Sequence, residues 1–169
     1  MMMGRLPLSR GTRTSKSEKL RTSLSRTLSG IAGEYFVAGE LTRRGYIASL
    51  TLRNTRGIDI LASNADATKS VGIQVKTNQG NKRDWLLTAV AETDIAENLF
   101  YVFVRLNGVG VPEYYIVPRN VVAKHVRDGH RAWLSTPGRD GKPHNENPLR
   151  TFRDRVDEYR DRWKLLGLD

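Results

Sequence analysis

Hydrophobic residues in the first quarter of the chain recur with the spacing of one helical face. From residue 20 to residue 41, apolar side chains stand three and four positions apart, which predicts an amphipathic helix. The pattern is strongest over residues 30–45, where Ser29 can cap the start and Gly45 can end the helix. A start near Ser17 fits the same spacing, so the position of the first turn stays open between the two serines.

Five apolar segments that follow have the length and composition of β-strands. They are rich in β-branched and aromatic residues, and Gly, Asn and Pro separate them. We expect strands at residues 46–52, 57–62, 71–77, 99–106 and 114–118. The fourth is almost continuously apolar, which is typical of a central strand covered on both faces.

Helical spacing returns in the second half of the chain. Residues 120–129 predict a short helix that Asn120 can cap. After a loop rich in Gly, Pro and Asn, apolar residues at spacings of three and four predict a helical extension over residues 149–167. This apolar stripe consists of Phe152, Val156, Tyr159, Trp163 and Leu166. The segment between the third and fourth strands mixes polar loop with ambiguous patterns, and no strand is assigned there.

This order of elements predicts an α/β fold with a mixed central sheet flanked by helices. The chain has 169 residues, which suits one domain, and it contains no internal repeat. We expect a basic, flexible N-terminal arm over residues 1–28 and a single domain over residues 29–169. The core of that domain should lie in residues 29–120.

The charge of the chain favours an anionic partner. Its formal net charge is +10, and residues 1–28 alone carry seven basic residues and one acidic residue. Nucleic acid is the first candidate partner and an acidic membrane surface the second. The arm can contact phosphates without specificity, and its composition would also suit an organelle transit peptide.

Several classes of protein are excluded by the composition. The chain has no cysteine, so disulfide scaffolds, thiolate zinc sites and cysteine nucleophiles are ruled out. It lacks both the apolar run of about 20 residues that spans a membrane and the apolar core of a secretory signal. We therefore expect a cytoplasmic protein that does not span a membrane.

Four polar side chains interrupt apolar patterns in the first half of the domain. Glu34 lies on the expected helix, and its neighbours one turn further along are apolar, where a carboxylate is costly unless it is paired or binds metal. Asp59 interrupts the apolar segment 57–62, although Asp has a poor β propensity. Gln74 and Lys76 alternate with apolar residues and therefore point to the same face of a strand.

Two carboxylates, an amide oxygen and a lysine at one sheet edge can hydrolyse a phosphodiester. Carboxylates bind a hard divalent cation such as Mg²⁺. The cation polarises the phosphodiester and lowers the pKa of a bound water, and a lysine ammonium orients that water or offsets the charge of the transition state. The four residues are therefore a candidate catalytic site.

The motifs around these residues resemble those of the PD-(D/E)xK, or restriction-endonuclease-like, nuclease superfamily. The resemblance rests on Glu34 in GEYFVAGEL, Asp59 in GIDIL and Gln74 with Lys76 in IQVK, in that order. It implies an αβββαβ core and Mg²⁺ or Mn²⁺ as the cofactor. By the same resemblance Asp59 is the main metal ligand and Glu34 assists it. The carbonyl of Val75 adds a metal contact, and Lys76 is catalytic.

Gln74 stands where the superfamily usually has Asp or Glu. An amide offers a carbonyl oxygen but no charge, so we expect Gln74 to be a weaker metal ligand of the catalytic site. Restriction enzymes that act on modified DNA are among the nucleases known to carry Gln at this place. The resemblance is therefore compatible with an active enzyme.

Each of these residues also has a purely structural interpretation. Glu34 can pair with a base such as Arg56, and Asp59 can be a hydrogen-bonding residue beside a turn. Lys76 can be an edge-strand lysine that opposes aggregation. Gln74 can be an ordinary polar residue that points outward.

Basic residues around the site are candidates for contacts with nucleic acid. Arg53 and Arg56 precede the second expected strand, and Lys82 and Arg83 follow the third. All four can bind phosphates. Trp85, close behind them, can stack on a base or belong to the core.

We expect a metal-dependent phosphodiester hydrolase that acts on DNA, and the resemblance implies a role in restriction, defence or repair. A homodimer is plausible by the same resemblance, and a protein partner that supplies specificity would suit so small a chain. One alternative is a catalytically inactive module of this fold that binds nucleic acid or a protein. Another is a structural or assembly protein.

Overall fold

The structure is a computed structural model that describes residues 24–52, 57–93 and 95–169. The expected N-terminal arm lies almost wholly outside these residues, as do Arg53 and Arg56. Helix α2 begins at Arg26, so the last three residues of the expected arm belong to the helix. The division of the chain into an arm and a single domain otherwise stays a prediction.

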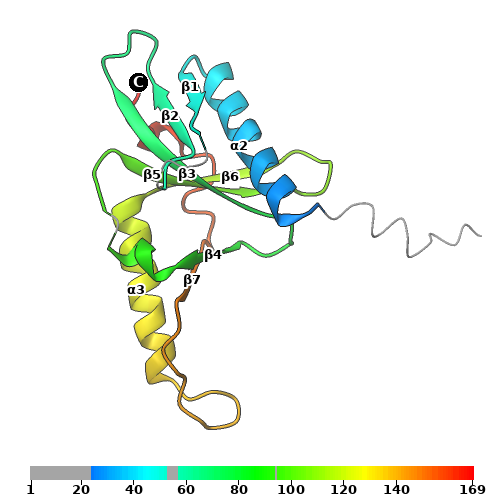
Figure 1. Ribbon diagram of the computed structural model, residues 1–169, viewed down its shortest axis with the longest axis vertical. Coiled ribbons are helices and arrows are strands. Elements are labelled where there is room, and N and C mark those ends of the chain that lie inside the picture. Colours follow the sequence, from blue (N-terminus) through cyan, green and yellow to red (C-terminus); the bar gives the residue numbers. More distant parts are fainter. Residues whose placement is uncertain (1–23, 53–56, 94) are drawn as a thin grey trace, which may run out of the picture.

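A five-stranded mixed sheet forms the centre of the fold (Figure 1). In spatial order its strands are β1 (Ile47–Leu50), β2 (Ile60–Ser63), β3 (Ser70–Asn78), β5 (Leu99–Arg105) and β6 (Glu113–Pro118). Strands β3 and β5 run parallel, and the other neighbours are antiparallel. All five strands expected from the sequence are present, and the mixed central sheet is confirmed.

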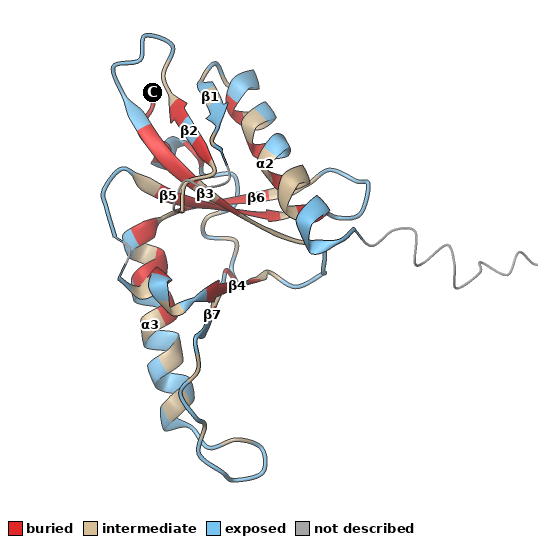
Figure 2. Cartoon of the chain, in the orientation of Figure 1, coloured by how far each residue is buried: buried red, intermediate tan, exposed pale blue. Residues whose placement is uncertain are grey.

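Helices and a smaller sheet cover the two faces of the central sheet. Helix α2 (Arg26–Arg43) packs on one face against β1 and β3. Helix α3 (Arg119–Ser135) lies on the other face together with a two-stranded sheet of β4 (Asp84–Thr88) and β7 (Leu149–Arg153). The described residues therefore form two hydrophobic cores, one on each side of the strands (Figure 2).

Strand β5 serves both cores, as its apolar run predicts. Phe100, Val102 and Val104 belong to the core beneath α2, whereas Tyr101 and Phe103 belong to the core beneath α3. The alternation follows from the two-residue period of a strand. Burial on both faces makes β5 the central support of the molecule.

The ends of α2 are closed by local hydrogen bonds. The Ser25 hydroxyl accepts a hydrogen bond from the Leu28 amide at 3.2 Å and caps the first turn. Ser29, the expected cap, instead lies buried inside the helix. At the other end Gly45 adopts a φ of 89°, and the Tyr46 amide donates to the Leu41 carbonyl at 3.1 Å. This Schellman-type ending confirms the predicted role of Gly45.

The helical extension expected over residues 149–167 is wrong. Leu149–Arg153 instead forms strand β7, and only a single 3₁₀ turn, η2 (Trp163–Leu166), follows. Phe152 stacks on Phe103 with ring centroids 4.5 Å apart, which anchors the strand. The buried carboxylate of Asp154 accepts hydrogen bonds from the backbone amides of Val156, Glu158 and Tyr159. These bonds turn the chain after β7. Tertiary packing therefore overrides a spacing that also fits a helix.

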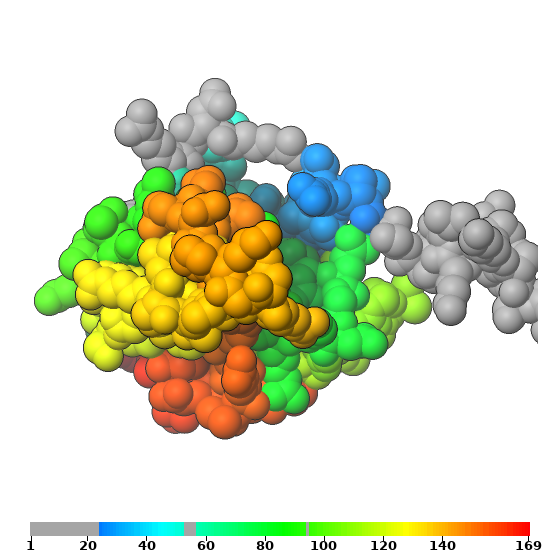
Figure 3. Space-filling view, turned by 90° about the horizontal axis from the view of Figure 1, so that it is seen from below, coloured from blue at the N-terminus to red at the C-terminus, as the bar shows by residue number. Residues whose placement is uncertain are grey.

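Two further elements differ from the sequence-based expectation. Helix α3 runs for 17 residues, from Arg119 to Ser135, and Asn120 lies inside its first turn instead of capping it. The middle segment, left unassigned, contains β4 and a 3₁₀ turn, η1 (Ala89–Glu92). Its pairing with a strand more than 60 residues away gives no local signal. Helix α3 and the segment after it form the projecting end of the molecule, seen from below in yellow and orange (Figure 3).

No helix among the described residues is long and apolar enough to cross a membrane.

Gly33 fixes how closely α2 approaches the sheet. A Cβ at this position would lie 1.9 Å from the hydroxyl oxygen of Thr77, 3.1 Å from its Cβ and 3.2 Å from its Cγ2. No rotation of the β-branched side chain removes all three contacts. Because Glu34 is the next residue, this packing also sets the position of a candidate site residue.

We predict that Gly33→Ala lowers the free energy of unfolding by about 1–3 kcal/mol, because the added methyl group overpacks the helix against β3. Gly39→Ala, in the same helix with open space around it, should instead raise stability by about 0.5–1 kcal/mol. Urea unfolding of both variants measures the difference. Equal stability of the two variants would contradict the packing argument.

Candidate active site

Asp59 is attached to β3 by its backbone and by its side chain. Its amide donates to the Ile73 carbonyl at 2.8 Å, and its carboxylate oxygen Oδ2 accepts a hydrogen bond from the Val75 amide at 2.7 Å. The residue lies immediately before β2, one position outside the strand in which the sequence pattern placed it. Just before the first residue of β2, the carboxylate takes the place of a backbone carbonyl as the acceptor for β3. The interpretation of Asp59 as a hydrogen-bonding residue is therefore correct, and it is compatible with a role in the site.

Glu34 and Asp59 line the same pocket, of about 300 Å³. Glu34 comes from α2, and Asp59 comes from the segment that leads into β2, with Thr51 and Ile58 beside them. Both carboxylates are partly buried. The structure thus brings together the two acids that the sequence singled out, from elements 25 residues apart.

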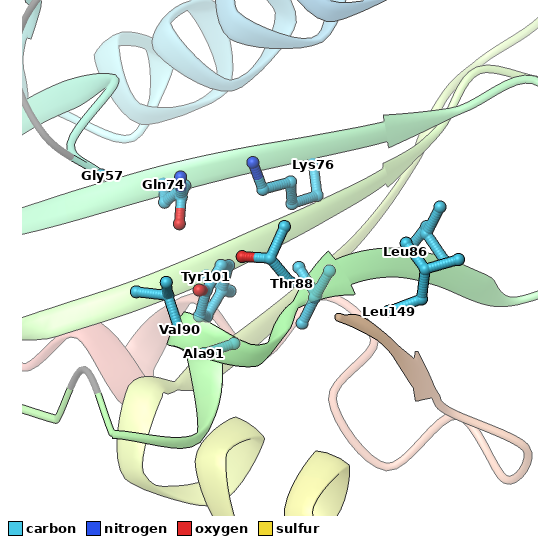
Figure 4. A pocket seen from close by; sticks show the side chains of 10 residues that line it. Gly57, Gln74, Lys76, Leu86, Thr88, Val90, Ala91, Tyr101 and Leu149 are labelled. Carbon is cyan, nitrogen blue, oxygen red and sulfur yellow. The ribbon is translucent and has the colours of Figure 1, made fainter. Parts of the chain in front are cut away.

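Gln74 and Lys76 line a second cavity, of about 690 Å³ (Figure 4). They lie on the face of β3 opposite Ile73 and Val75, which belong to the core beneath α2. Strand β3 lies between β2 and β5, but its pairing with β2 ends at Ile73, so at Lys76 the strand is paired only with β5. The shared face that alternation predicts for Gln74 and Lys76 is confirmed.

The four candidate residues therefore form two pairs on two pockets. The hydrogen bond from the Val75 amide to Asp59 joins these pairs, because Val75 stands between Gln74 and Lys76 in the chain. The acids approach from the side of α2, and the amide and lysine from the side of the small sheet.

Arg119 is a buried residue of this region that the sequence analysis missed. Only 2% of the side chain is exposed, and its Nη2 donates hydrogen bonds to the Gly57 carbonyl and to Gln74 Oε1, the latter at 3.5 Å. The guanidinium lies over the Tyr101 ring, 5.2 Å from its centroid. Arg119 thus connects the segment before Asp59 to β3 and places a positive charge behind Gln74. An arginine at the start of a helix is usually exposed, so its sequence position gave no signal.

The available ligands suit Mg²⁺ by their chemistry. The Glu34 and Asp59 carboxylates, the Gln74 amide oxygen and the Val75 carbonyl are all hard oxygen donors, which this ion prefers. No group of three or more His, Asp or Glu side chains that could hold a metal ion occurs within the described ranges. Mg²⁺ is commonly bound by one or two carboxylates and completed by waters and substrate phosphates, so a pair of acids fits this ion.

The loop before β4 presents basic side chains at a separate, open groove. Lys82 and Arg83 line it together with Arg153 and Arg155. Arg83 also pairs with Asp157 at 3.0 Å. Contact of Lys82 and Arg83 with nucleic acid stays a prediction.

Trp85 is a core residue and not a stacking platform for a base. Its side chain is only 2% exposed, and its indole Nε1 donates to the Val104 carbonyl at 3.0 Å. The ring packs against Phe103 and Tyr115. Of the two interpretations of Trp85, the core one is confirmed.

Comparison with solved structures finds nucleases. The fold is similar to that of a bacterial homing endonuclease, I-Ssp6803I, with a TM-score of 0.53 and 13% sequence identity over 85% of this chain and 92% of that one. Hjc, a Holliday junction resolvase from Archaeoglobus fulgidus, aligns with a TM-score of 0.45 and 14% identity over 74% of this chain and 84% of the resolvase. No protein-family model and no curated protein matches the sequence.

The fold is therefore a mixed α/β fold similar to that of the homing endonuclease. The mixed sheet flanked by helices and the similarity to the homing endonuclease confirm the restriction-endonuclease-like α/β fold expected from the sequence. At 13% identity the similarity shows the fold alone. The Gln-containing catalytic site stays a prediction.

We predict different effects for two substitutions of Asp59. Asp59→Ala leaves the buried Val75 amide without this acceptor and should lower the free energy of unfolding by about 1–3 kcal/mol. Asp59→Asn keeps an acceptor oxygen and should lose only about 1 kcal/mol. Urea unfolding in EDTA measures both without a metal contribution. A stability of Asp59→Ala equal to that of the wild type would show that the hydrogen bond contributes nothing.

We also predict that Gln74→Glu stabilises the fold through Arg119. A carboxylate at this position gains a charge-assisted hydrogen bond from the buried guanidinium, with a coupling of about 1–3 kcal/mol. A double-mutant cycle with Arg119→Met, in which each variant is unfolded by heat or urea, measures the coupling free energy between the two side chains. If Gln74→Glu has the same effect in both backgrounds, the two side chains do not interact directly.

Proposed function

We propose that this protein is a metal-dependent endonuclease that hydrolyses phosphodiester bonds of DNA. The observation that carries the proposal is the hydrogen bond between Asp59 Oδ2 and the Val75 amide. It joins a carboxylate to the middle residue of the Gln74–Lys76 segment, which supports the proposal that acids, amide and lysine act as one site. The nuclease fold supports the same conclusion.

In this proposal the two acids hold the cation. Asp59 is the main ligand, because the bond to Val75 fixes its carboxylate, and Glu34 assists from α2. The Val75 carbonyl and the Gln74 amide add neutral oxygens. When bound, Mg²⁺ or Mn²⁺ lowers the pKa of a water and polarises the phosphodiester.

Lys76 has the complementary role. Its ammonium lies on the cavity side of β3, where it can orient the attacking water or offset charge on the phosphoryl oxygens. The water oxygen bonds to phosphorus, and the bond from phosphorus to one ester oxygen breaks. The products are a phosphate monoester end and a hydroxyl end. A role in restriction, defence or repair is part of the proposal, as are a homodimer and a protein partner that supplies specificity.

A second candidate function is a catalytically inactive module that binds DNA. The contact between Arg119 Nη2 and Gln74 Oε1 favours it, because the guanidinium competes with a cation for the amide oxygen. The loss of one acid at this position also weakens metal binding. Such a module would bind DNA without cutting it.

We predict that the wild type cleaves DNA with Mg²⁺ or Mn²⁺ and not with EDTA. Asp59→Asn and Lys76→Met should each reduce the rate by about 100-fold or more, since each removes a charge that acts on the transition state. Gel assays with supercoiled plasmid, linear duplex and single-stranded DNA measure the rates. Asp59→Asn is preferred over Ala because it keeps an acceptor for Val75.

The matched control is Lys164→Met, which removes an exposed lysine from the 3₁₀ turn η2 and should leave cleavage unchanged. Cleavage that survives in Asp59→Asn would contradict the assigned site. DNA binding without cleavage by the wild type would favour the inactive module.

A further inference from the structure

The cavity beside Lys76 has two unlike walls. One wall is β3, with the polar side chains of Gln74 and Lys76. The facing wall comes from β4, η1 and β7 and contributes the apolar side chains of Leu86, Val90 and Leu149 (Figure 4). A phosphate alone would bind to the polar wall and would gain nothing from contact with the apolar one.

The side chains of the apolar wall are exposed and do not belong to either hydrophobic core. Leu86 is 63% exposed, Val90 65% and Leu149 51%. Strand β4 alternates, with Trp85 and Leu87 in the core and Leu86 on the opposite side. Leu149 pairs with Thr88 across the small sheet and so shares that side. Leu86 and Leu149 therefore share one face of the small sheet, and Val90 of η1 lines the same cavity, where an apolar occupant would cover all three.

The chemistry of a nucleic-acid strand identifies this occupant. Phosphate, sugar and base are covalently joined, so a strand that brings a phosphate to Lys76 places the adjoining base in the same cavity. The face of a base suits an apolar wall, and its edge can hydrogen-bond with the amide of Gln74. In continuous duplex the base faces are covered by stacked neighbours, so only an unstacked nucleotide can use this wall.

We propose that this cavity binds one unstacked nucleotide next to the phosphate that is cleaved. The substrate class is then DNA with an unpaired nucleotide at the cleavage position, in preference to continuous duplex. The inference rests on the proposed function, because it takes Lys76 as the residue that meets the phosphate.

The test compares two DNAs of the same sequence, a continuous duplex and a duplex with one extra unpaired nucleotide. Affinity is measured by fluorescence anisotropy with Ca²⁺ in place of Mg²⁺, so that binding is read without hydrolysis. We expect the wild type to bind the DNA with the unpaired nucleotide about tenfold more tightly, as stacking on one side-chain surface allows. The double variant Leu86→Ser/Val90→Ser should lose this preference.

The control variant is Val109→Ser, which removes a fully exposed apolar side chain between β5 and β6 and should keep the preference. Circular dichroism checks that the double variant is folded, which its exposed positions favour. Equal affinity of the wild type for both DNAs, absence of binding to either, or a preference that the double variant keeps would each overturn the inference.

The outcomes separate this inference from the proposed function. A binding preference without cleavage in Mg²⁺ supports the nucleotide pocket and refutes the nuclease. Cleavage of DNA together with equal affinities refutes the pocket and leaves the nuclease in place.

Discussion

The candidate site depends on the hydrogen bond between the Asp59 carboxylate and the Val75 amide. Strand β2 begins only at Ile60, so a backbone carbonyl no longer meets the amide of Val75, and the carboxylate takes over. An unpaired buried amide is unfavourable, so the bond fixes the acid where β2 and β3 separate. One interaction thus continues the contact of this segment with β3 and ties the carboxylate to the backbone between Gln74 and Lys76. The contact agrees with the structural interpretation of Asp59, and a catalytic role of the same carboxylate stays a prediction.

Two other features hold the elements around this bond. Gly33 lets α2 lie directly on Thr77, which brings Glu34 to the pocket of Asp59. On the opposite side Arg119 contacts Gly57, two residues before Asp59, and Gln74 in β3. The segment that carries the aspartate is therefore fixed from both faces of the sheet. Preorganisation of this kind keeps charged groups in position before a substrate binds.

The sequence predicted those parts of the structure that depend on local pattern. The five strands of the central sheet, the end of α2 at Gly45 and the shared face of Gln74 and Lys76 follow from residue alternation and turn chemistry. Strand β7 was missed because its residues also fit a helical spacing, and only Phe152 on the aromatic core and the turn at Asp154 decide between the two. Arg119 was missed because its role is set by contacts with residues 45 and 62 positions away. Local pattern thus picked out the candidate residues but not the arginine that hydrogen-bonds to Gln74.

Arg119 also affects how the glutamine at position 74 is interpreted, because its guanidinium hydrogen-bonds to that side chain. A carboxylate there would lie against a buried guanidinium, and the pair would neutralise itself instead of offering its full charge to a cation. An amide keeps an oxygen at the same place and adds no negative charge beside Arg119. The acids Glu34 and Asp59 line one pocket and Lys76 lines the other, so negative and positive side chains are separated between the two. The glutamine is therefore consistent with a division of charge between the two pockets, and not only with the loss of a metal ligand.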